Sequence, residues 1–238
     1  MEETIATQEF TSNEEKSKAI THKDSALKRL DISFNKHIEA SEYKQSNLLS
    51  YWIKDFANYH DNEKTFSPNS LKNFKRGDIV KVNLGFNIGN ELGGLHYCVV
   101  INKNDNIYSN TINIIPLSSA KEDKIYNPTT CINLGDELYN SLCEKFEKEM
   151  SEVSSKLLTI DAENLKSFEI EKISKKLEFL KKLEAEIDKM KHGSIAFVHQ
   201  ITTISKQRIF KTPILSGIKL SNEGLDLIDE KISNLFMK

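Results

Sequence analysis

The amino-acid sequence predicts an α+β fold in which a β-rich domain is interrupted by a helical hairpin. Residues 74–135 contain short apolar segments with strand-like alternation, and residues 136–191 contain two long apolar stripes at helical spacing. Residues 192–238 return to a strand pattern and end in a helix, whereas residues 1–73 are expected to be a helical extension. Strands before and after the hairpin are therefore expected to share one sheet.

The N-terminal extension is polar and charged at its start, which is compatible with disorder, and a first helix is expected near residues 14–30. Between Ser41 and Tyr59, apolar side chains recur every three or four residues and predict a helix with one apolar stripe. That stripe needs a surface to pack against, either on the β-rich domain or on a partner. Residues 65–73, which contain Ser-Pro-Asn, predict a connecting loop.

The β-rich domain is expected to open with three strands. Asp78–Leu84 alternates apolar and polar residues, as a half-buried strand does. Tyr97–Ile101 is a continuous apolar run typical of a strand buried on both faces, and Thr111–Leu117 is the next strand. A loop with three glycines at Asn87–Gly94 and other polar turns join these segments, which indicates a compact barrel or sandwich.

The hairpin consists of two predicted helices with lysine and glutamate on their outer faces, and Asp161 is a candidate N-cap for the second helix. It carries no conspicuous chemical group, so it is expected to serve as architecture or as a docking surface. After it, Ser194–Ile201 is expected to be a strand, and Gln207–Thr212 is expected to continue the sheet. Ser221 is expected to begin the last helix.

Composition limits the possible functions. The net charge is −2, so any contact with nucleic acid must come from a local patch. Cys98, Cys131 and Cys143 have no zinc-type spacing, and no apolar run is long enough for a signal peptide or a membrane span. These features predict a cytoplasmic protein without a metal ion or another cofactor.

Four segments resemble PemK/MazF-like toxins, the mRNA interferases of type II toxin-antitoxin systems, in their order and spacing. Lys75–Leu84 (KRGDIVKVNL) is similar to the opening strand of the family, and Gly89–Ile101 is similar to its glycine loop and second strand. Ile112–Ser119 (INIIPLSS) and Val198–Ile209 (VHQITTISKQRI) are similar to later segments, and a closing helix follows. The hairpin is then an insertion within this domain.

The resemblance implies an SH3-like β-barrel, usually a homodimer, that cleaves single-stranded RNA without a metal ion and is neutralised by a cognate antitoxin protein. In this family the 2′-hydroxyl attacks the adjacent phosphodiester, leaving a 2′,3′-cyclic phosphate and a 5′-hydroxyl. The reaction requires a base near the 2′-hydroxyl, an acid at the leaving oxygen and a group that holds the phosphate.

The resemblance points to His96, Ser118 and Glu91 as catalytic residues. His96 replaces a family arginine, which exchanges a permanent bidentate phosphate clamp for an imidazole that transfers protons near neutral pH. Ser118 keeps the hydroxyl of a family threonine and is expected to donate to the phosphate. Glu91 is expected to support His96, although a solvated loop charge is an equal alternative.

RNA contacts are expected from Lys81, Asn83, Gln200, Thr203, Lys206 and Arg208. Lys206 and Arg208 would contact phosphates, with ordinary loop charges as the alternative. His199 stands where the family often has an acidic residue. It could form an acid/base pair with His96, or it could be a buried histidine bonded to backbone.

Two rival functions remain open. The same barrel could be a non-catalytic RNA- or protein-binding module after loss of the arginine, or a gyrase-inhibiting toxin. Cleavage of RNA without a metal ion separates the ribonuclease from both rivals.

Overall fold

The computed structural model describes residues 12–159, 167–190 and 193–237. The chain divides into two compact units, Met1–Phe56 and Ala57–Lys238. No helix in the described ranges is both long and apolar enough to cross a membrane.

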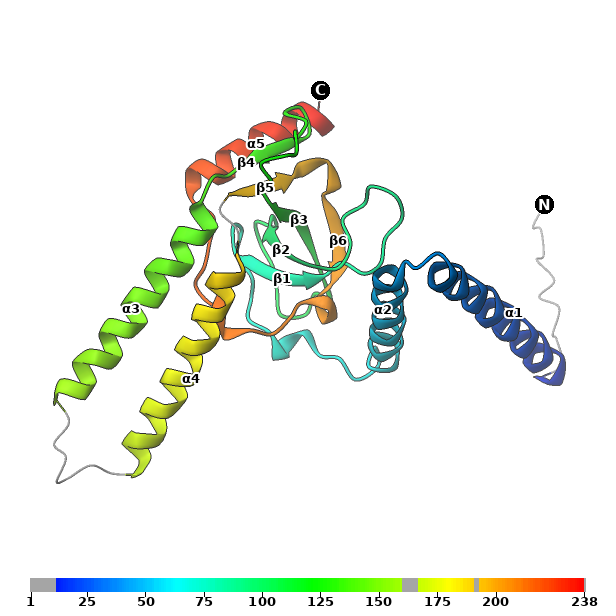
Figure 1. Ribbon diagram of the computed structural model, residues 1–238, viewed down its shortest axis with the longest axis horizontal. Helices are drawn as coiled ribbons and strands as arrows, with labels where there is room; N and C mark the ends of the chain where they lie inside the picture. Colours follow the sequence, from blue (N-terminus) through cyan, green and yellow to red (C-terminus); the bar gives the residue numbers. More distant parts are fainter. Residues whose placement is uncertain (1–11, 160–166, 191–192, 238) are drawn as a thin grey trace, which may run out of the picture. The chain divides into compact units, whose positions relative to one another are not determined.

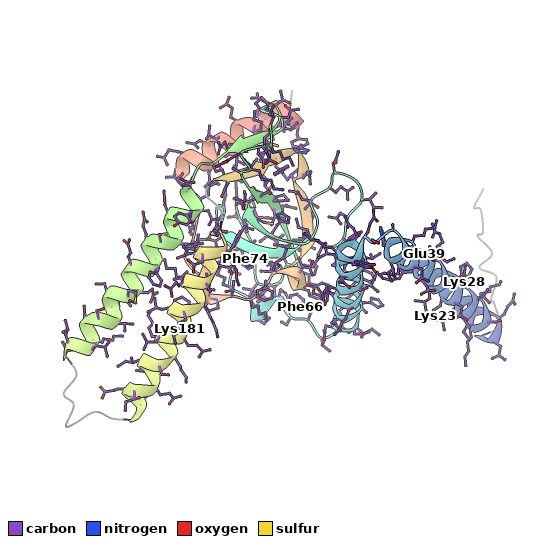
Figure 2. The ribbon with its side chains drawn as sticks, in the orientation of Figure 1. Lys23, Lys28, Glu39, Phe66, Phe74 and Lys181 are labelled. Atoms are coloured by element: carbon purple, nitrogen blue, oxygen red, sulfur yellow. The ribbon has the colours of Figure 1, made fainter. Side chains whose placement is uncertain are left out.

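The first unit contains helix α1 (Ser12–Glu39) and most of helix α2 (Tyr43–Asp61). Helix α1 is longer than the predicted segment, and its first turn is acidic and its last turn basic, which complements the helix dipole. Between the helices, Ser41 has a φ of 60°, a left-handed conformation that interrupts the helical path. Charged side chains such as Lys23, Lys28 and Glu39 are exposed along α1 (Figure 2).

The described part of the second unit is built on an antiparallel sheet of six strands (Figure 1). They are β1 (Ile79–Asn83), β2 (Leu95–Val100), β3 (Thr111–Ser119), β4 (Cys131–Asn133), β5 (Ser194–Phe197) and β6 (Thr202–Ser205). Their order is β1-β2-β3-β5-β4, and β6 also pairs with β3. The prediction that strands on both sides of the hairpin share one sheet is therefore confirmed.

Strand β3 is paired along both of its edges. One of its edges pairs with β2, while the other pairs first with β6 and then, from Leu117 to Ser119, with β5. After β6, Ile209 forms a bridge with Val82, and the Phe210 amide donates to the Lys81 carbonyl at 2.7 Å. The chain thus returns from β6 to the outer edge of β1, which suits a barrel. The SH3-like class stays a prediction from the resemblance.

Both faces of the sheet are buried, because apolar side chains stand on each side of the central strands. One face holds Val82, Cys98, Val100, Ile112, Ile114 and Ile204. The other holds Val99, Ile115 and Leu117, which pack with Leu142, Leu183 and Ile228 from three helices. The predicted burial of β2 on both faces is confirmed for Cys98, Val99 and Val100.

Helices α3 (Glu137–Thr159) and α4 (Ser167–Lys189) pack side by side and connect β4 to β5, which pair with each other (Figure 1). The hairpin therefore joins two neighbouring strands, and its status as an insertion stays a prediction. The Lys145 ammonium of α3 donates to the carbonyls of Pro213, Ile214 and Ser216 at 2.8–3.1 Å. The candidate N-cap Asp161 lies outside the described residues.

Two strand predictions need correction. The strand expected at Ser194–Ile201 ends at Phe197, and a 3-10 turn, η2 (Val198–Gln200), follows it. The expected continuation of the sheet at Gln207–Thr212 is only partly right: Ile209 bridges Val82, but the strand of this region is β6, and residues 206–208 form another 3-10 turn, η3, capped by the Ser205 side chain. At the C-terminal end, the Ser221 hydroxyl accepts the Gly224 amide at 3.0 Å and begins α5 (Asn222–Phe236), as predicted.

Candidate functional site

A cavity of about 360 Å³ lies where the glycine loop after β1 meets the chain that follows β5. Its lining residues are Leu84, Asn87, Glu91, Leu92, Pro116, His199, Gln200, Ile201, Thr202, Ile204 and Arg208. All four segments that resemble the toxin family contribute to this lining. Of the predicted site residues, it brings together Glu91, Gln200 and Arg208 with His199.

The glycine loop is held over the cavity by the Gln200 side chain. Its Oε1 accepts the Leu92 amide at 2.8 Å, and its Nε2 donates to the Asn90 carbonyl at 3.0 Å. Backbone amides only donate and carbonyls only accept, so these two partners determine the orientation of the Gln200 amide group. Gln200 was expected to contact RNA, but these atoms are occupied within the protein, where they position the loop that carries Glu91.

The same loop is tightly folded at its base. A Cβ on Gly93 would lie 2.8 Å from the Gly85 carbonyl oxygen, so a larger residue would displace the loop. The Asn87 side chain donates to the Leu92 carbonyl at 2.7 Å and closes the loop from inside. Glu91 itself is exposed, and it lines the cavity.

Arg208 supplies the cation of the cavity. Its Nε donates to the Asn83 carbonyl at the end of β1 at 2.8 Å, and the residue is half-buried. Burial lowers the pKa of Arg208, while nearby Tyr59 and Cys98 raise it; a guanidinium nevertheless stays charged at neutral pH. Burial also raises the pKa of the Cys98 thiol, and Arg208 opposes that increase. The Arg208 guanidinium therefore interacts electrostatically with Cys98 on β2.

His96 lies on β2 beside this cavity. It pairs with Val82, and Cys98, two residues further along β2, pairs with the cavity residue Pro116. The half-buried ring places its Nδ1 at 2.8 Å from the Leu117 carbonyl. Because a carbonyl only accepts, Nδ1 carries the hydrogen, and in the neutral ring Nε2 is left as the basic nitrogen. The Leu117 carbonyl, rather than a carboxylate, orients this imidazole.

Ser118 is half-buried on β3 and pairs with Ile195 of β5. It directly follows Leu117, whose carbonyl binds His96, so the two candidate catalytic residues occupy neighbouring positions of adjacent strands. Neither of them is among the lining residues of the cavity.

His199 presents a second imidazole, and it is exposed rather than buried. Its Nδ1 lies 3.2 Å from the Thr130 carbonyl, so this nitrogen also carries the hydrogen. Its Nε2 is 3.4 Å from the Gln200 Nε2. Both imidazoles thus have Nδ1 held by a backbone carbonyl.

The other predicted RNA contacts lie elsewhere. Lys206 is 1% exposed, and its ammonium is 2.7 Å from Asp105 and 3.0 Å from the Asn106 carbonyl, so it is not available to a phosphate. Lys81 forms an ion pair with Glu186 of α4. Thr203 hydrogen-bonds Asn113 on the strand face opposite the buried Ile204.

Three further polar residues, Asn83, Asn87 and Thr202, belong to this region of the structure. Asn83 accepts the Gly85 amide at 3.0 Å through its side chain and Arg208 through its carbonyl. Asn87 and Thr202 line the cavity without having been predicted. Thr202 lies two positions before Ile204, so the two side chains share one face of β6. Within the described residues, no group of three or more His, Cys, Asp or Glu side chains is placed to hold a metal ion.

The comparison with known proteins agrees with the resemblance. A family model described as PemK-like, MazF-like toxin of type II toxin-antitoxin system matches residues 75–190. No curated protein matches the chain. The matched range includes the glycine loop, His96 and Ser118, whereas the cavity residues from His199 to Arg208 follow it in sequence. The resemblance is confirmed over residues 75–190, which match the family of PemK-like, MazF-like toxins of type II toxin-antitoxin systems.

Proposed function

We propose that the protein is the toxin of a type II toxin-antitoxin system and acts as an endoribonuclease on single-stranded RNA. The reaction is transfer of the phosphodiester to the 2′-hydroxyl, which needs no metal ion. The observation that carries this proposal is the orientation of His96, whose Nδ1 is held by the Leu117 carbonyl beside a cavity that contains a half-buried arginine. The match of residues 75–190 to the toxin family supports the toxin assignment.

His96 acts as the base in this proposal. Its Nε2 accepts the proton of the 2′-hydroxyl while the oxygen attacks phosphorus and the bond to the 5′-oxygen breaks. Arg208 binds the non-bridging phosphate oxygens, and a half-buried guanidinium suits this role because its charge is less screened than a surface charge. Ser118 adds a hydroxyl donor next to His96.

The leaving 5′-oxygen requires a proton. His199 is the candidate acid because it lines the cavity and its imidazolium form can donate a proton. Glu91 lines the same cavity. Gln200 is assigned a positioning role, since its amide holds the loop that carries Glu91.

The experiment is a cleavage assay on a long single-stranded RNA in EDTA, followed by mapping of the cut sites and analysis of the ends. We expect 2′,3′-cyclic or 3′-phosphate ends and 5′-hydroxyls. An oligonucleotide with one deoxynucleotide at the mapped position should resist cleavage there, because it lacks the nucleophile. Cutting at that deoxynucleotide, or a strict requirement for Mg²⁺, would overturn the mechanism.

The family also implies an antitoxin partner, and the resemblance favours a homodimer. Light scattering on the purified protein measures the assembly. If wild-type protein cleaves no RNA of varied sequence, the non-catalytic binding module becomes the better account.

A further inference from the structure

The first residues of β2 are supported by a neighbouring strand on one edge only. Among the described residues, β2 pairs with β1 from Leu95 onwards, whereas its pairing with β3 begins at Cys98. His96 lies in the segment between these two points. On the β3 side it is held through its side chain, by the hydrogen bond from Nδ1 to the Leu117 carbonyl at 2.8 Å. The orientation of the imidazole therefore depends on what else fixes this segment.

The next residue, Tyr97, is fixed by the helical hairpin. Its side chain lies on the opposite face of the strand from that of His96, because neighbouring residues of a strand alternate. The Tyr97 hydroxyl donates to a carboxylate oxygen of Glu186 on α4, and the same oxygen binds the Lys81 ammonium. Lys81 pairs with Tyr97 across β1 and β2, and its ammonium lies 5.2 Å from the centre of the Tyr97 ring. Two neighbouring strands thus converge on one carboxylate.

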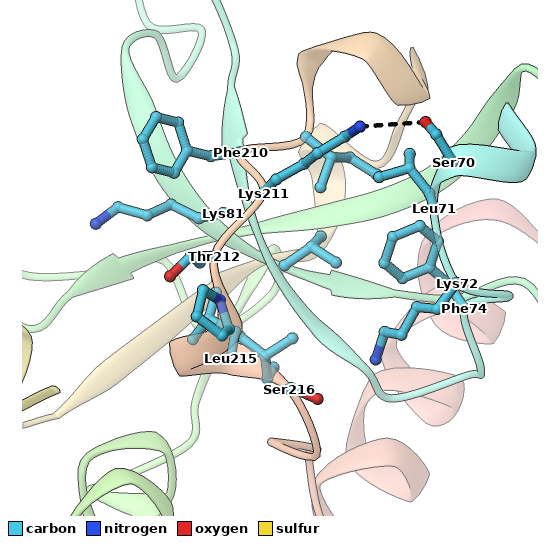
Figure 3. Close-up of a pocket in the computed structure, with 14 residues that line it drawn as sticks. Ser70, Leu71, Lys72, Phe74, Lys81, Phe210, Lys211, Thr212, Leu215 and Ser216 are labelled. Atoms are coloured by element: carbon cyan, nitrogen blue, oxygen red, sulfur yellow. Dashed lines mark hydrogen bonds between the residues drawn. The ribbon is translucent and has the colours of Figure 1, made fainter. Parts of the chain in front are cut away.

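The position of Lys81 fits this role. It lies at the edge of a cavity of about 300 Å³ beside β1, and its ammonium end points away from Phe74 on the other side (Figure 3). The side chains of Lys81 and Glu186 are 20% and 16% exposed. An ion pair with this little exposure is weakly screened by salt, so Lys81 is bound to α4.

The apolar face of α4 brings Glu186 to this point. Leu183 is fully buried and belongs to the same core cluster as Val99 of β2, and Ile187 packs against that cluster. Glu186 follows Leu183 by three residues, so the two share one face of the helix. Tyr97 precedes Val99 by two residues, so these two share one face of the strand. The steps are about 4.5 Å along the helix and about 6.6 Å along the strand, close enough for the side chains to meet.

The contact between Tyr97 and Glu186 joins a neutral donor to a charged acceptor. Burial raises the pKa of Tyr97, and the hydrogen bond to Glu186 raises it further, so the phenol keeps its proton. A hydrogen bond to a carboxylate is shorter and stronger than one between neutral groups. Desolvating a carboxylate within an apolar stripe is unfavourable, and an apolar residue would pack the hairpin at least as well. Packing alone therefore does not account for Glu186.

We propose that Glu186 is a positioning residue for His96 and acts through Tyr97. The helical hairpin then contributes to catalysis, because α4 fixes the segment of β2 that carries the base. Without the bond between Tyr97 and Glu186 this segment shifts, and the bond from Nδ1 of His96 to the Leu117 carbonyl is weakened. The imidazole then samples both tautomers, and Nε2 is the basic nitrogen for only part of the time. The effect on rate rests on the proposed ribonuclease function, whereas the effect on the His96 ring does not.

The test compares the full-length wild type with three variants. Tyr97→Phe removes only the hydroxyl, Glu186→Ala removes its acceptor, and the double variant removes both. Glu184→Ala, at an exposed glutamate two residues earlier on α4, is the matched control. Urea denaturation identifies conditions under which each variant is folded. The two measurements are kcat and KM for RNA cleavage in EDTA, and the ¹⁵N chemical shifts of the His96 ring, which report the tautomer and are assigned with His96→Ala.

Tyr97→Phe and Glu186→Ala should each lower kcat by about tenfold to a hundredfold, because a small displacement of a catalytic group has an effect of this size. KM should change much less. The double variant should lose no more than the worse single variant, because both substitutions remove the same contact. In all three, the His96 signals should move from the Nδ1–H tautomer towards a mixture, and Glu184→Ala should match the wild type.

Unchanged His96 shifts in Tyr97→Phe would overturn the proposal, whether or not kcat falls. A loss of stability alone would then mean that the contact only supports the fold, and a loss of kcat alone would mean that it acts through another group. If the wild type cleaves no RNA, the proposed function fails, and the His96 shifts still decide whether Glu186 positions the ring.

Discussion

Replacing Lys206 with methionine separates a structural role from an RNA contact. Its ammonium and the Asp105 carboxylate are 2.7 Å apart, and both side chains are 1% exposed. At an effective dielectric constant of about 20, the attraction across this 2.7 Å is about 6 kcal/mol, most of which offsets the desolvation of the two groups. Removing one partner leaves a buried charge without compensation, and we expect Lys206→Met to lower the free energy of unfolding by roughly 3–5 kcal/mol.

Urea denaturation at pH 7 measures this change, and the m-value should stay constant if only stability has changed. Asp105→Asn keeps an acceptor for the Phe74 amide, which Asp105 binds at 3.0 Å. The double variant should therefore be less destabilised than the sum of the single variants. Lys103→Met, an exposed lysine in the preceding loop, is the control and should have little effect. Wild-type stability of Lys206→Met together with weakened RNA binding would refute this reasoning.

Two further predictions concern neighbouring contacts. In Gln200→Ala, the loop that carries Glu91 loses both of its hydrogen bonds to Gln200. Hydrogen exchange at the Leu92 amide should therefore become faster, and kcat should fall more than the stability does. Unchanged exchange would exclude the positioning role of Gln200. Burial alone raises the pKa of Glu186, but hydrogen bonds from Lys81 and Tyr97 lower it below its ordinary value. Glu186 therefore stabilises the fold above the ordinary pKa of about 4.3 and loses this contribution as pH falls through the lowered value. Glu186→Gln should be less stable than the wild type at pH 7, and urea titrations should show the difference shrinking below about pH 4; a constant difference would contradict it.

Much of the fold was predictable from residue periodicity. The strands β1, β2 and β3 and the helices α3, α4 and α5 each contain enough residues to show an apolar repeat, and the N-cap Ser221 has a local signature. The three residues of β4 are too few for any repeat. The bounds of β6 were not predicted, because a 3-10 turn with polar residues lies on each side of it and hides where the strand begins and ends.

The candidate site was less predictable, because its contacts join distant parts of the chain. Gln200 and the Leu92 amide are 108 positions apart, so nothing local distinguishes this clamp from an RNA-binding amide. Lys206 and Asp105 are likewise joined only by the fold, and a lysine near the end of a strand is usually exposed. His96 was identified from its place in a recognisable segment, whereas the carbonyl that orients it belongs to another strand.

The most direct test of the account is the rate of RNA cleavage in EDTA by the wild type, His96→Ala and His96→Arg. If Nε2 of His96 transfers the proton, both variants should fold normally and lose about 10²- to 10⁴-fold in rate, because an arginine has no basic nitrogen at neutral pH. Retained or increased activity in His96→Arg would instead mean electrostatic contact with the phosphate. Wild-type rates in His96→Ala would contradict the account and transfer the catalytic assignment to His199.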